Sequence, residues 1–187
     1  YVLFITESGK MFRLKCYEIP ECSRTAKGTS IVNLLPIEAG EKIAAMIHLS
    51  DIDDESKYLL MATEKGLIKR TKLTQFKNIR KNGLIALHLR EGDRLCAVRL
   101  TDGDDSVLIA TRKGKAVRFN ENAVRPMSRI ATGVRGIKLR EGDCVVSFTV
   151  VKDDEYLLTI TDKGFGKKCA PDQYRLQSRG GMGTINY

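Results

Sequence analysis

The sequence lacks the features that would indicate a membrane protein, a secreted protein or a zinc protein. None of its apolar runs approaches the roughly 18–20 residues of a membrane-spanning helix. Its first residues have no basic segment before an apolar run, so we expect no signal peptide. The five cysteines are odd in number and contain no Cys-x-x-Cys spacing. Reduced cysteines of a cytosolic protein are therefore favoured over a disulfide framework or a zinc site.

Residues and motifs that carry catalysis are also scarce. The two histidines, His48 and His88, lie in apolar stretches and are interpreted as structural. The metalloprotease, nucleotide-binding and serine-hydrolase motifs are absent. The acidic run from Asp51 to Glu55 lacks the glycine and the distal glutamate of an EF-hand loop. We therefore expect no catalytic residue, no metal site and no cofactor in this chain.

The charge is strongly unbalanced in favour of bases. Lysine and arginine number 32 and aspartate and glutamate 23 among 187 residues, which gives a formal net charge of +9. Hydrophobic residues make up 42% of the chain, enough for a packed core. An excess of positive charge on a small folded protein indicates a polyanionic partner without saying which one.

A short motif occurs four times along the chain. Each copy has apolar residues, a threonine, a glycine three positions later and a base four positions after the glycine. The copies are 3–13, 60–70, 108–118 and 158–168, with glycines at Gly9, Gly66, Gly114 and Gly164 and bases at Arg13, Arg70, Arg118 and Lys168. Successive glycines of the motif are about 50 residues apart, and recurrence at such a spacing is the signature of a repeat architecture.

Two further motifs keep phase with the first. Ser-Arg-x-x-x-Gly occurs at 23–28, 128–133 and 178–183, and residues 78–83 form a looser copy. A glycine beside an acidic residue then precedes an apolar stretch at 40–41, 91–93 and 141–143. Three motifs that recur in the same order establish an internal repeat of about 50 residues.

Each copy is predicted to contain four short strands. In the second copy they are 43–49, 58–63, 67–73 and 84–89, which are rich in branched and aromatic residues and separated by glycine or aspartate. Four strands per repeat are typical of a propeller blade. We therefore expect an all-β, propeller-like single domain over 1–187, truncated at both ends, with blades at 1–38 (partial), 39–90, 91–140 and 141–187.

Acidic and basic residues are segregated within each copy. Acids gather in the turns at 51–55, 102–105 and 153–155, whereas residues 65–90 contain bases and no acid. We expect the acidic turns to gather in one zone and the basic segments to line another. A basic track made by repetition suits a regular polymer of phosphates.

The motifs resemble the C-terminal domains of the A-type subunits of bacterial DNA gyrase. The most specific residues are 18–20, 24–28, 31–36, 132–139 and 142–143. The resemblance implies a β-pinwheel of six four-stranded blades that exchange strands, of which this chain would hold a fragment. It implies wrapping of double-stranded DNA around a basic rim for ATP-dependent negative supercoiling. It also implies a location in the bacterial cytoplasm, associated with the nucleoid and not with a membrane. The expected partners are the rest of the A-type subunit and the B-type subunit, in an A2B2 assembly. Other domains of that assembly would use ATP and Mg²⁺.

A seven-residue box, Gln-Arg-Arg-Gly-Gly-Lys-Gly, is needed for tight wrapping in that family. A degenerate version with five matching positions occurs here in a later blade than in the family, and we expect the true box to precede Tyr1. Its residues are Gln177, Ser178, Arg179, Gly180, Gly181, Met182 and Gly183. The related A-type subunit of topoisomerase IV has degraded or absent boxes, so either enzyme remains open as the parent.

The bases of the repeated motifs are the predicted DNA contacts. They are expected to bind phosphates rather than read bases, because no recognition helix is available for the major groove. The residues are Arg13, Lys15, Arg24, Lys27, Lys69, Arg70, Lys72, Arg80, Lys81, Lys115, Arg118, Arg129, Arg135, Lys167, Lys168 and Arg179.

Two other binding functions are compatible with a basic β-repeat. A protein-interaction propeller of the chromatin-condensation-regulator or WD type also has four-stranded repeats, although the chain contains no tryptophan for a Trp-Asp signature. RNA binding is disfavoured because the basic segments lack interleaved aromatic residues for base stacking.

Overall fold

The computed structural model describes residues 1–187 and consists of strands and short 3-10 helices, with no α-helix. The strands are β1 (Val2–Thr6), β2 (Lys10–Leu14), β3 (Ile43–His48), β4 (Tyr58–Thr63), β5 (Leu67–Lys72), β6 (Leu84–Ile85), β7 (Leu95–Thr101), β8 (Ser106–Thr111), β9 (Lys115–Asn120), β10 (Val134–Arg135), β11 (Val145–Val151), β12 (Leu157–Ile160), β13 (Gly166–Cys169) and β14 (Thr184–Ile185). The 3-10 helices are η1 (Cys16–Glu18), η2 (Ile31–Asn33), η3 (Leu73–Phe76), η4 (Glu121–Ala123) and η5 (Pro171–Gln173). None of these short helices could span a lipid bilayer.

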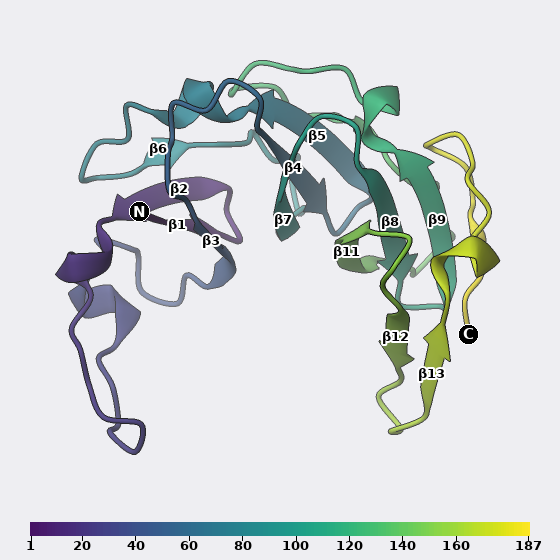
Figure 1. Ribbon diagram of the computed structural model, residues 1–187, viewed down its shortest axis with the longest axis horizontal. Coiled ribbons are helices and arrows are strands. Elements are labelled where there is room, and N and C mark those ends of the chain that lie inside the picture. The colour runs from purple at the N-terminus through teal and green to yellow at the C-terminus, as the bar shows by residue number, and fades with distance from the viewer.

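The strands form a row of antiparallel sheets that follow one another around an open arc (Figure 1). Three sheets have four strands, in the orders β3-β1-β2-β6, β7-β4-β5-β10 and β11-β8-β9-β14. The fourth contains β12 and β13. β3, β7 and β11 lie on the inner side of the arc, where β7 contacts both of the others. The expected all-β, propeller-like fold is confirmed.

The outermost strand of each complete sheet comes from the following repeat. β6 follows β5 in sequence but pairs with β2, in the register Lys10↔Ile85. In the same way β10 pairs with β5 and β14 pairs with β9. We call residues 77–90, 125–140 and 175–187, which contain these strands, the crossing segments. They tie each sheet to the next part of the chain, which is the strand exchange that the resemblance implied.

The crossing segments also cover the hairpin turns of the preceding sheets. At Gly66, in the turn between β4 and β5, the backbone has φ +82°, a conformation that glycine adopts without strain. A Cβ atom there would lie 2.8 Å from the carbonyl oxygen of Ile137 in the second crossing segment. The glycine of the first motif therefore serves the turn and also the close approach of the neighbouring repeat.

The core lies between consecutive sheets. Leu3 and Met11 of the first sheet pack with Leu59 and Met61 of the second in one buried cluster. A second cluster joins the second sheet to the third, with Ile68 packed among residues such as Phe119. Because each sheet buries one face against the next, the stacking of neighbouring repeats fixes the positions of their edges.

The blade boundaries differ from those expected at 39–90, 91–140 and 141–187. Each expected blade begins with the strand that pairs in the structure with the preceding sheet. Residues 43–48, for example, pair with β1 along Val2↔His48 to Thr6↔Ile43. The boundary was misplaced because a repeat of sequence motifs fixes the period but not the residue at which one sheet ends.

The fourth sheet is the least covered of the four sheets. It has two strands, and the side chains of Tyr156, Leu158, Ile160 and Phe165 are exposed. At Gly164, which corresponds to Gly66, an added Cβ atom would have no heavy atom within 4 Å. No crossing segment lies over this hairpin turn.

Candidate nucleic-acid interface

The bases at the end of the first motif occupy equivalent positions in the four sheets. In three of them the cation lies over the ring of a tyrosine that precedes or begins the first strand: Arg13 over Tyr1 at 5.0 Å, Arg70 over Tyr58 at 4.1 Å and Lys168 over Tyr156 at 4.1 Å. In the third sheet Arg118 donates from Nε to the hydroxyl of Ser106 at 2.8 Å. The motif therefore places one cation against the first strand of each repeat.

Three of these cations also bind the 3-10 helix region of the following repeat. Arg13 donates to the carbonyl of Lys77 at 3.1 Å, after η3. Arg70 donates to the carbonyl of Glu121 at 3.3 Å, in η4. Arg118 donates to the carbonyl of Pro171 at 2.8 Å, in η5. Their guanidinium groups therefore join successive repeats, a role that the sequence pattern did not reveal.

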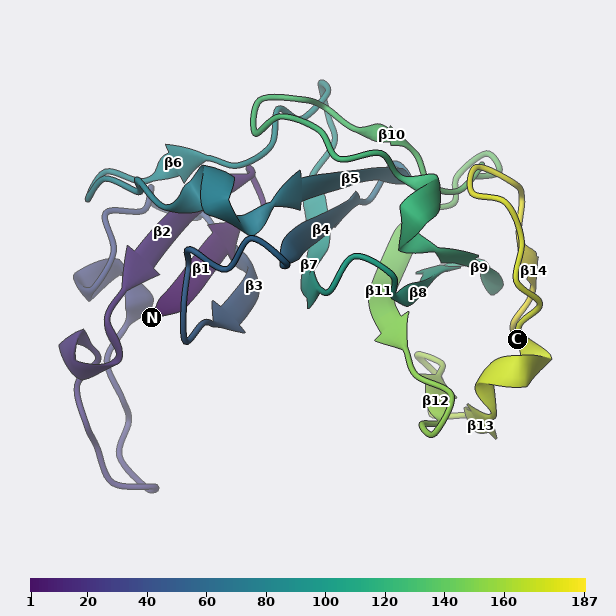
Figure 2. The same ribbon diagram turned by 45° about the horizontal axis from the view of Figure 1, so that its top comes forward.

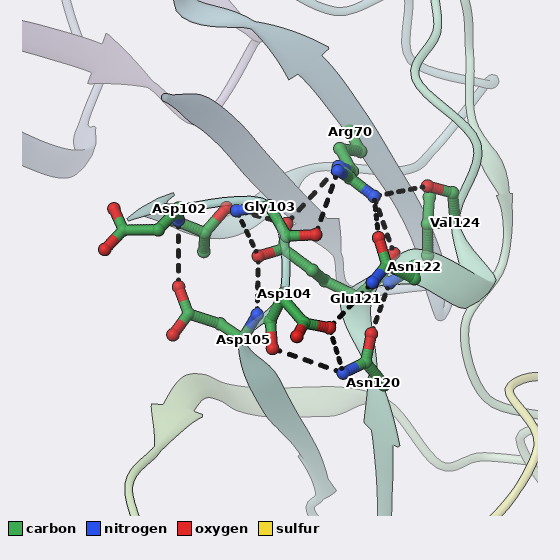
Figure 3. A network of polar contacts seen from close by, with 10 residues as sticks. Arg70, Asp102, Gly103, Asp104, Asp105, Asn120, Glu121, Asn122 and Val124 are labelled. Carbon is green, nitrogen blue, oxygen red and sulfur yellow. Dashed lines mark hydrogen bonds and ion pairs between the residues drawn. The ribbon is translucent and has the colours of Figure 1, made fainter. Parts of the chain in front are cut away.

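Arg70 belongs to a buried polar network (Figure 3). Its Nε lies 3.3 Å from Oε2 of Glu121, whose side chain is fully buried. The hydroxyl of Thr101 donates to the same Oε2 at 2.8 Å. The backbone N–H groups of Gly103 and Asp105 donate to Oε1, each at 2.9 Å. The carboxylate and the guanidinium compensate each other's charge away from solvent, as buried ions require.

Lys69, which precedes Arg70, is fully buried. Its ammonium donates to the carbonyl of Ala86 at 2.6 Å and to the carbonyl of Arg129, so it connects two crossing segments. Burial, with a smaller effect of the Arg129 charge, lowers the pKa of Lys69 to about 7. The corresponding residues of the first and third sheets are apolar, Phe12 and Val117.

These positions correct part of the predicted set of DNA contacts. Lys69 and Arg70 cannot reach a phosphate here, because their polar groups are buried against carbonyls and a carboxylate. The side chain of Arg118 is 13% exposed and pairs with Asp153 at 3.2 Å. Arg13 is half-buried. The four motif bases therefore do not form the continuous exposed track that the sequence analysis expected.

The arginines of the Ser-Arg motif are also engaged with backbone. Arg129 donates to the carbonyl of Ile85 in β6 at 2.9 Å. Arg179 donates to the carbonyl of Arg135 in β10 at 2.9 Å, and from Nε to that of Ala123 at 2.8 Å. Each attaches its own crossing segment to the preceding one, and both remain half-buried.

The remaining predicted contacts are accessible to differing degrees. Lys115 is half-buried, and the others are exposed: Lys15, Arg24, Lys27, Lys72, Arg80, Lys81, Arg135, Lys167 and Lys168. The loop with Arg24 and Lys27 extends away from the sheets at one end of the arc (Figure 1). Arg80, Lys81 and Arg135 lie on crossing segments, so these three residues point to a surface shared by several repeats.

The crossing segments carry the most one-sided charge of the molecule. Their strands β6, β10 and β14 follow the convex side of the arc (Figure 2). Within 77–90, 125–140 and 175–187 there are eleven bases and no acid. Nine of these bases are exposed: Lys77, Arg80, Lys81, Arg90, Arg125, Arg135, Lys138, Arg140 and Arg175.

Six of the exposed bases were absent from the predicted set, namely Lys77, Arg90, Arg125, Lys138, Arg140 and Arg175. The acid-free character of 65–90 was the signal that could have found the first two. The prediction selected bases of the repeated motifs instead. The position of a residue in a repeat does not reveal whether the neighbouring repeat covers its side chain.

The acidic turns lie closer to the motif arginines than expected. They connect an inner strand to the next sheet, as between β7 and β8 and between β11 and β12. Asp153 pairs with Arg118, and the carbonyl of Gly103 accepts from Arg70 at 3.1 Å. The expected separation therefore fails for these arginines, whereas the crossing segments contain no acid.

The glycines of the degenerate box pack against neighbouring backbone. The N–H of Gly180 donates to the carbonyl of Gly136 at 2.6 Å, and the carbonyl of Gly181 accepts from the N–H of Lys138 at 2.8 Å. At Gly183, with φ +69°, a Cβ atom would lie 2.5 Å from the carbonyl oxygen of Ala116. These contacts join two crossing segments and a strand, and they leave the Gly180 N–H engaged with a carbonyl.

The four sheets correspond to four segments that match a model of a known protein family. The model of the DNA gyrase C-terminal domain, beta-propeller, matches residues 1–50, 57–102, 105–152 and 155–187. The chain belongs to this family. The first three matched segments each end at or just after an inner strand, β3, β7 or β11, so the family repeats correspond to the observed sheets.

Relatives of the gyrase family match over the whole chain. The A-type subunit of DNA gyrase from Clostridium acetobutylicum is 54% identical over 100% of this chain, and that from Staphylococcus epidermidis is 44% identical over 98%. The chain spans 22% and 21% of those two relatives, about a fifth of their length. The A-type gyrase subunit is thus the protein whose C-terminal domain this chain resembles in sequence.

Solved structures of the same class have the same arrangement. The C-terminal domain of a DNA topoisomerase IV superposes with a TM-score of 0.90 at 30% identity, over 98% of this chain and 57% of that one. A DNA gyrase A C-terminal domain gives 0.83 at 31% identity, over 98% and 59%. These similarities confirm the β-pinwheel assignment for this member of the family.

Proposed function

We propose that this gyrase-family domain binds duplex DNA along its crossing segments and wraps it around the convex side of the arc. The observation that carries the proposal is the set of eleven bases without an acid in segments that lie side by side on that surface. A surface that carries bases and no acids attracts the phosphate groups of a polyanion along its whole length. The curvature of the arc gives the bound duplex a path to follow.

Binding is expected to be independent of base sequence. With no α-helix in the chain, no recognition helix is available to enter a major groove. Contacts from lysine and arginine to phosphates position DNA without reading its bases. Smooth bending of 20–30 base pairs costs about 1–6 kcal/mol, so residual preference follows the ease of bending.

The wrapping would serve the topoisomerase that contains the domain. In this proposal the parent enzyme is a gyrase that introduces negative supercoils, assembles as A2B2 with its B-type subunit, uses ATP and Mg²⁺ in other domains and acts on the nucleoid in the bacterial cytoplasm. Support comes from the family match and from the relatives among A-type gyrase subunits.

The dependence of DNA affinity on salt tests this function. If six phosphates are neutralised, the logarithm of the binding constant should fall with the logarithm of salt concentration with a slope of about −5. Electrophoretic shifts of a linear duplex at several salt concentrations provide the slope, and bending or topological change of a closed circle reports wrapping. A salt-independent affinity contradicts the proposal, and absence of any shift at low salt favours a protein-interaction scaffold.

A further inference from the structure

Two hollows occur at equivalent places on the convex side. One has a volume of about 410 Å³ and is lined by residues of the second crossing segment, between Arg125 and Val134. The other has a volume of about 500 Å³ and is lined by residues of the third, between Arg175 and Thr184. The two sets of residues are 50 positions apart in the sequence, which is the repeat length at this point. The hollow is therefore a feature of the repeat.

Both hollows arise from the way a crossing segment straddles one strand. In the second crossing segment, Pro126 bridges Arg70 in parallel and Val134 pairs with Ile68. In the third, Leu176 bridges Arg118 in the same way, and Thr184 pairs with Ala116. Both arms are attached to the same strand, and the loop between them borders an open, shallow hollow.

The linings provide hydrogen-bond donors and positive charge. Each hollow has an exposed arginine, Arg125 or Arg175, and an exposed serine, Ser128 or Ser178. Neither lining contains an acid. A site with arginine and hydroxyl donors and no acceptor carboxylate suits an oxyanion.

A buried donor in the third crossing segment gives independent support. The side-chain nitrogen of Gln177, which lines the second hollow, is inaccessible to solvent and has no hydrogen-bond partner. A buried N–H without an acceptor is unfavourable, and such groups in proteins call for a specific explanation. Gln177 lines the hollow, so a rotation of its side chain that exposes the amide there would give this donor a bound anion as its acceptor.

We propose that each hollow binds one phosphodiester group of duplex DNA. This inference rests on the proposed function and names the places where the backbone is held. Arg125 and Arg175 would supply charge, the two serines hydroxyl donors, and Gln177 an amide donor to the phosphate in the second hollow. The two hollows lie one repeat apart on the same surface, so a single duplex passing along the crossing segments would engage both.

Removing the two arginines tests the sites. In the double variant Arg125→Gln/Arg175→Gln, loss of two phosphate contacts should make the salt slope less steep by about 0.9 for each contact. The matched control is Lys152→Gln/Lys163→Gln, which removes the same charge from exposed residues outside the crossing segments. A double arginine variant with the slope and affinity of this control overturns the proposal.

The variant Gln177→Leu separates phosphate binding from a structural role. If the amide binds phosphate, the affinity for duplex falls at low salt while the urea midpoint of unfolding stays unchanged or rises, because an unpartnered buried donor has been removed. Unchanged affinity overturns the assignment of the second hollow. Failure of the unmodified chain to bind duplex refutes the proposed function instead, and wild-type binding with control-like variants refutes the hollows alone.

Discussion

The second and fourth sheets place the same kind of residue in very different surroundings. Arg70 and Lys168 both lie four residues after a hairpin glycine and stack on a tyrosine at 4.1 Å. Arg70 is 5% exposed because the following repeat covers it and supplies Glu121, whereas Lys168 is exposed. A cation in this repeat is therefore structural or accessible according to what the next repeat packs against it.

The largest expected effect is a loss of stability when the buried cation of this comparison, Arg70, is removed. Arg70→Ala should lower the free energy of unfolding by about 3–5 kcal/mol, because it leaves the buried carboxylate of Glu121 without its partner. Lys168→Ala should cost less than about 1 kcal/mol, because it removes an exposed cation–π contact. Urea unfolding of both variants measures the difference.

A second substitution checks the cause of that loss. Removing both buried charges, as in Arg70→Leu/Glu121→Leu, should recover part of the stability lost in Arg70→Ala, because no uncompensated ion remains. Equal destabilisation by Arg70→Ala and Lys168→Ala would show that the buried pair is not what distinguishes the two sheets.

The next effect is on the pH dependence of the free energy of unfolding. It compares Lys69 with Lys167, which directly precede Arg70 and Lys168 in the sequence. Folding lowers the pKa of Lys69 from 10.5 to about 7, so the unfolded chain binds this proton more tightly. The free energy of unfolding should therefore rise with pH above 7, by about 2 kcal/mol between pH 7 and 9, and stay flat below 7 as far as this group is concerned.

Two variants isolate that contribution. Lys69→Met should abolish the rise in urea stability between pH 7 and 9. Lys167→Met should leave it in place, because the Lys167 side chain is exposed to water. A pH profile that persists in Lys69→Met would assign the rise to other groups.

The smallest effect compares two glycines with the same backbone conformation. Gly66 and Gly164 both have φ +82°, so alanine costs the same conformational strain at each. Only at Gly66 does the new Cβ meet the carbonyl oxygen of Ile137, at 2.8 Å. Gly66→Ala should therefore destabilise by about 1 kcal/mol more than Gly164→Ala in thermal unfolding. Equal losses would mean that the crossing segment moves aside without cost.

Much of the local structure could be predicted from the sequence because it depends on neighbouring residues. The strand expected at 58–63 is β4, and that expected at 67–73 ends one residue earlier as β5. Branched residues favour extended backbone, and each glycine allows the turn between two strands. The strand expected at 84–89 is limited to β6 at 84–85, because the chain then leaves the sheet edge to cover the preceding hairpin turn.

The candidate interface could be predicted only in part. The net charge, the acid-free segments and the repeat are evident in the sequence, and they predicted a basic surface made by repetition. The choice of individual residues was less successful. Lys69 and Arg70 lie on a strand that the following crossing segment covers, whereas Arg125 and Arg175 belong to no motif that marked them as exposed.

The sequence by itself determined the repeat, the strands and the sign of the charge, since periodicity, strand propensity and composition are properties of the chain. Tertiary structure alone decided which bases face solvent. Each complete sheet takes its outer strand from the following repeat, so the surroundings of a side chain are set by residues far along the chain, as in the pairs Ile68↔Val134 and Ala116↔Thr184. Burial and partners at that distance are consequences of packing and are not encoded in any local pattern.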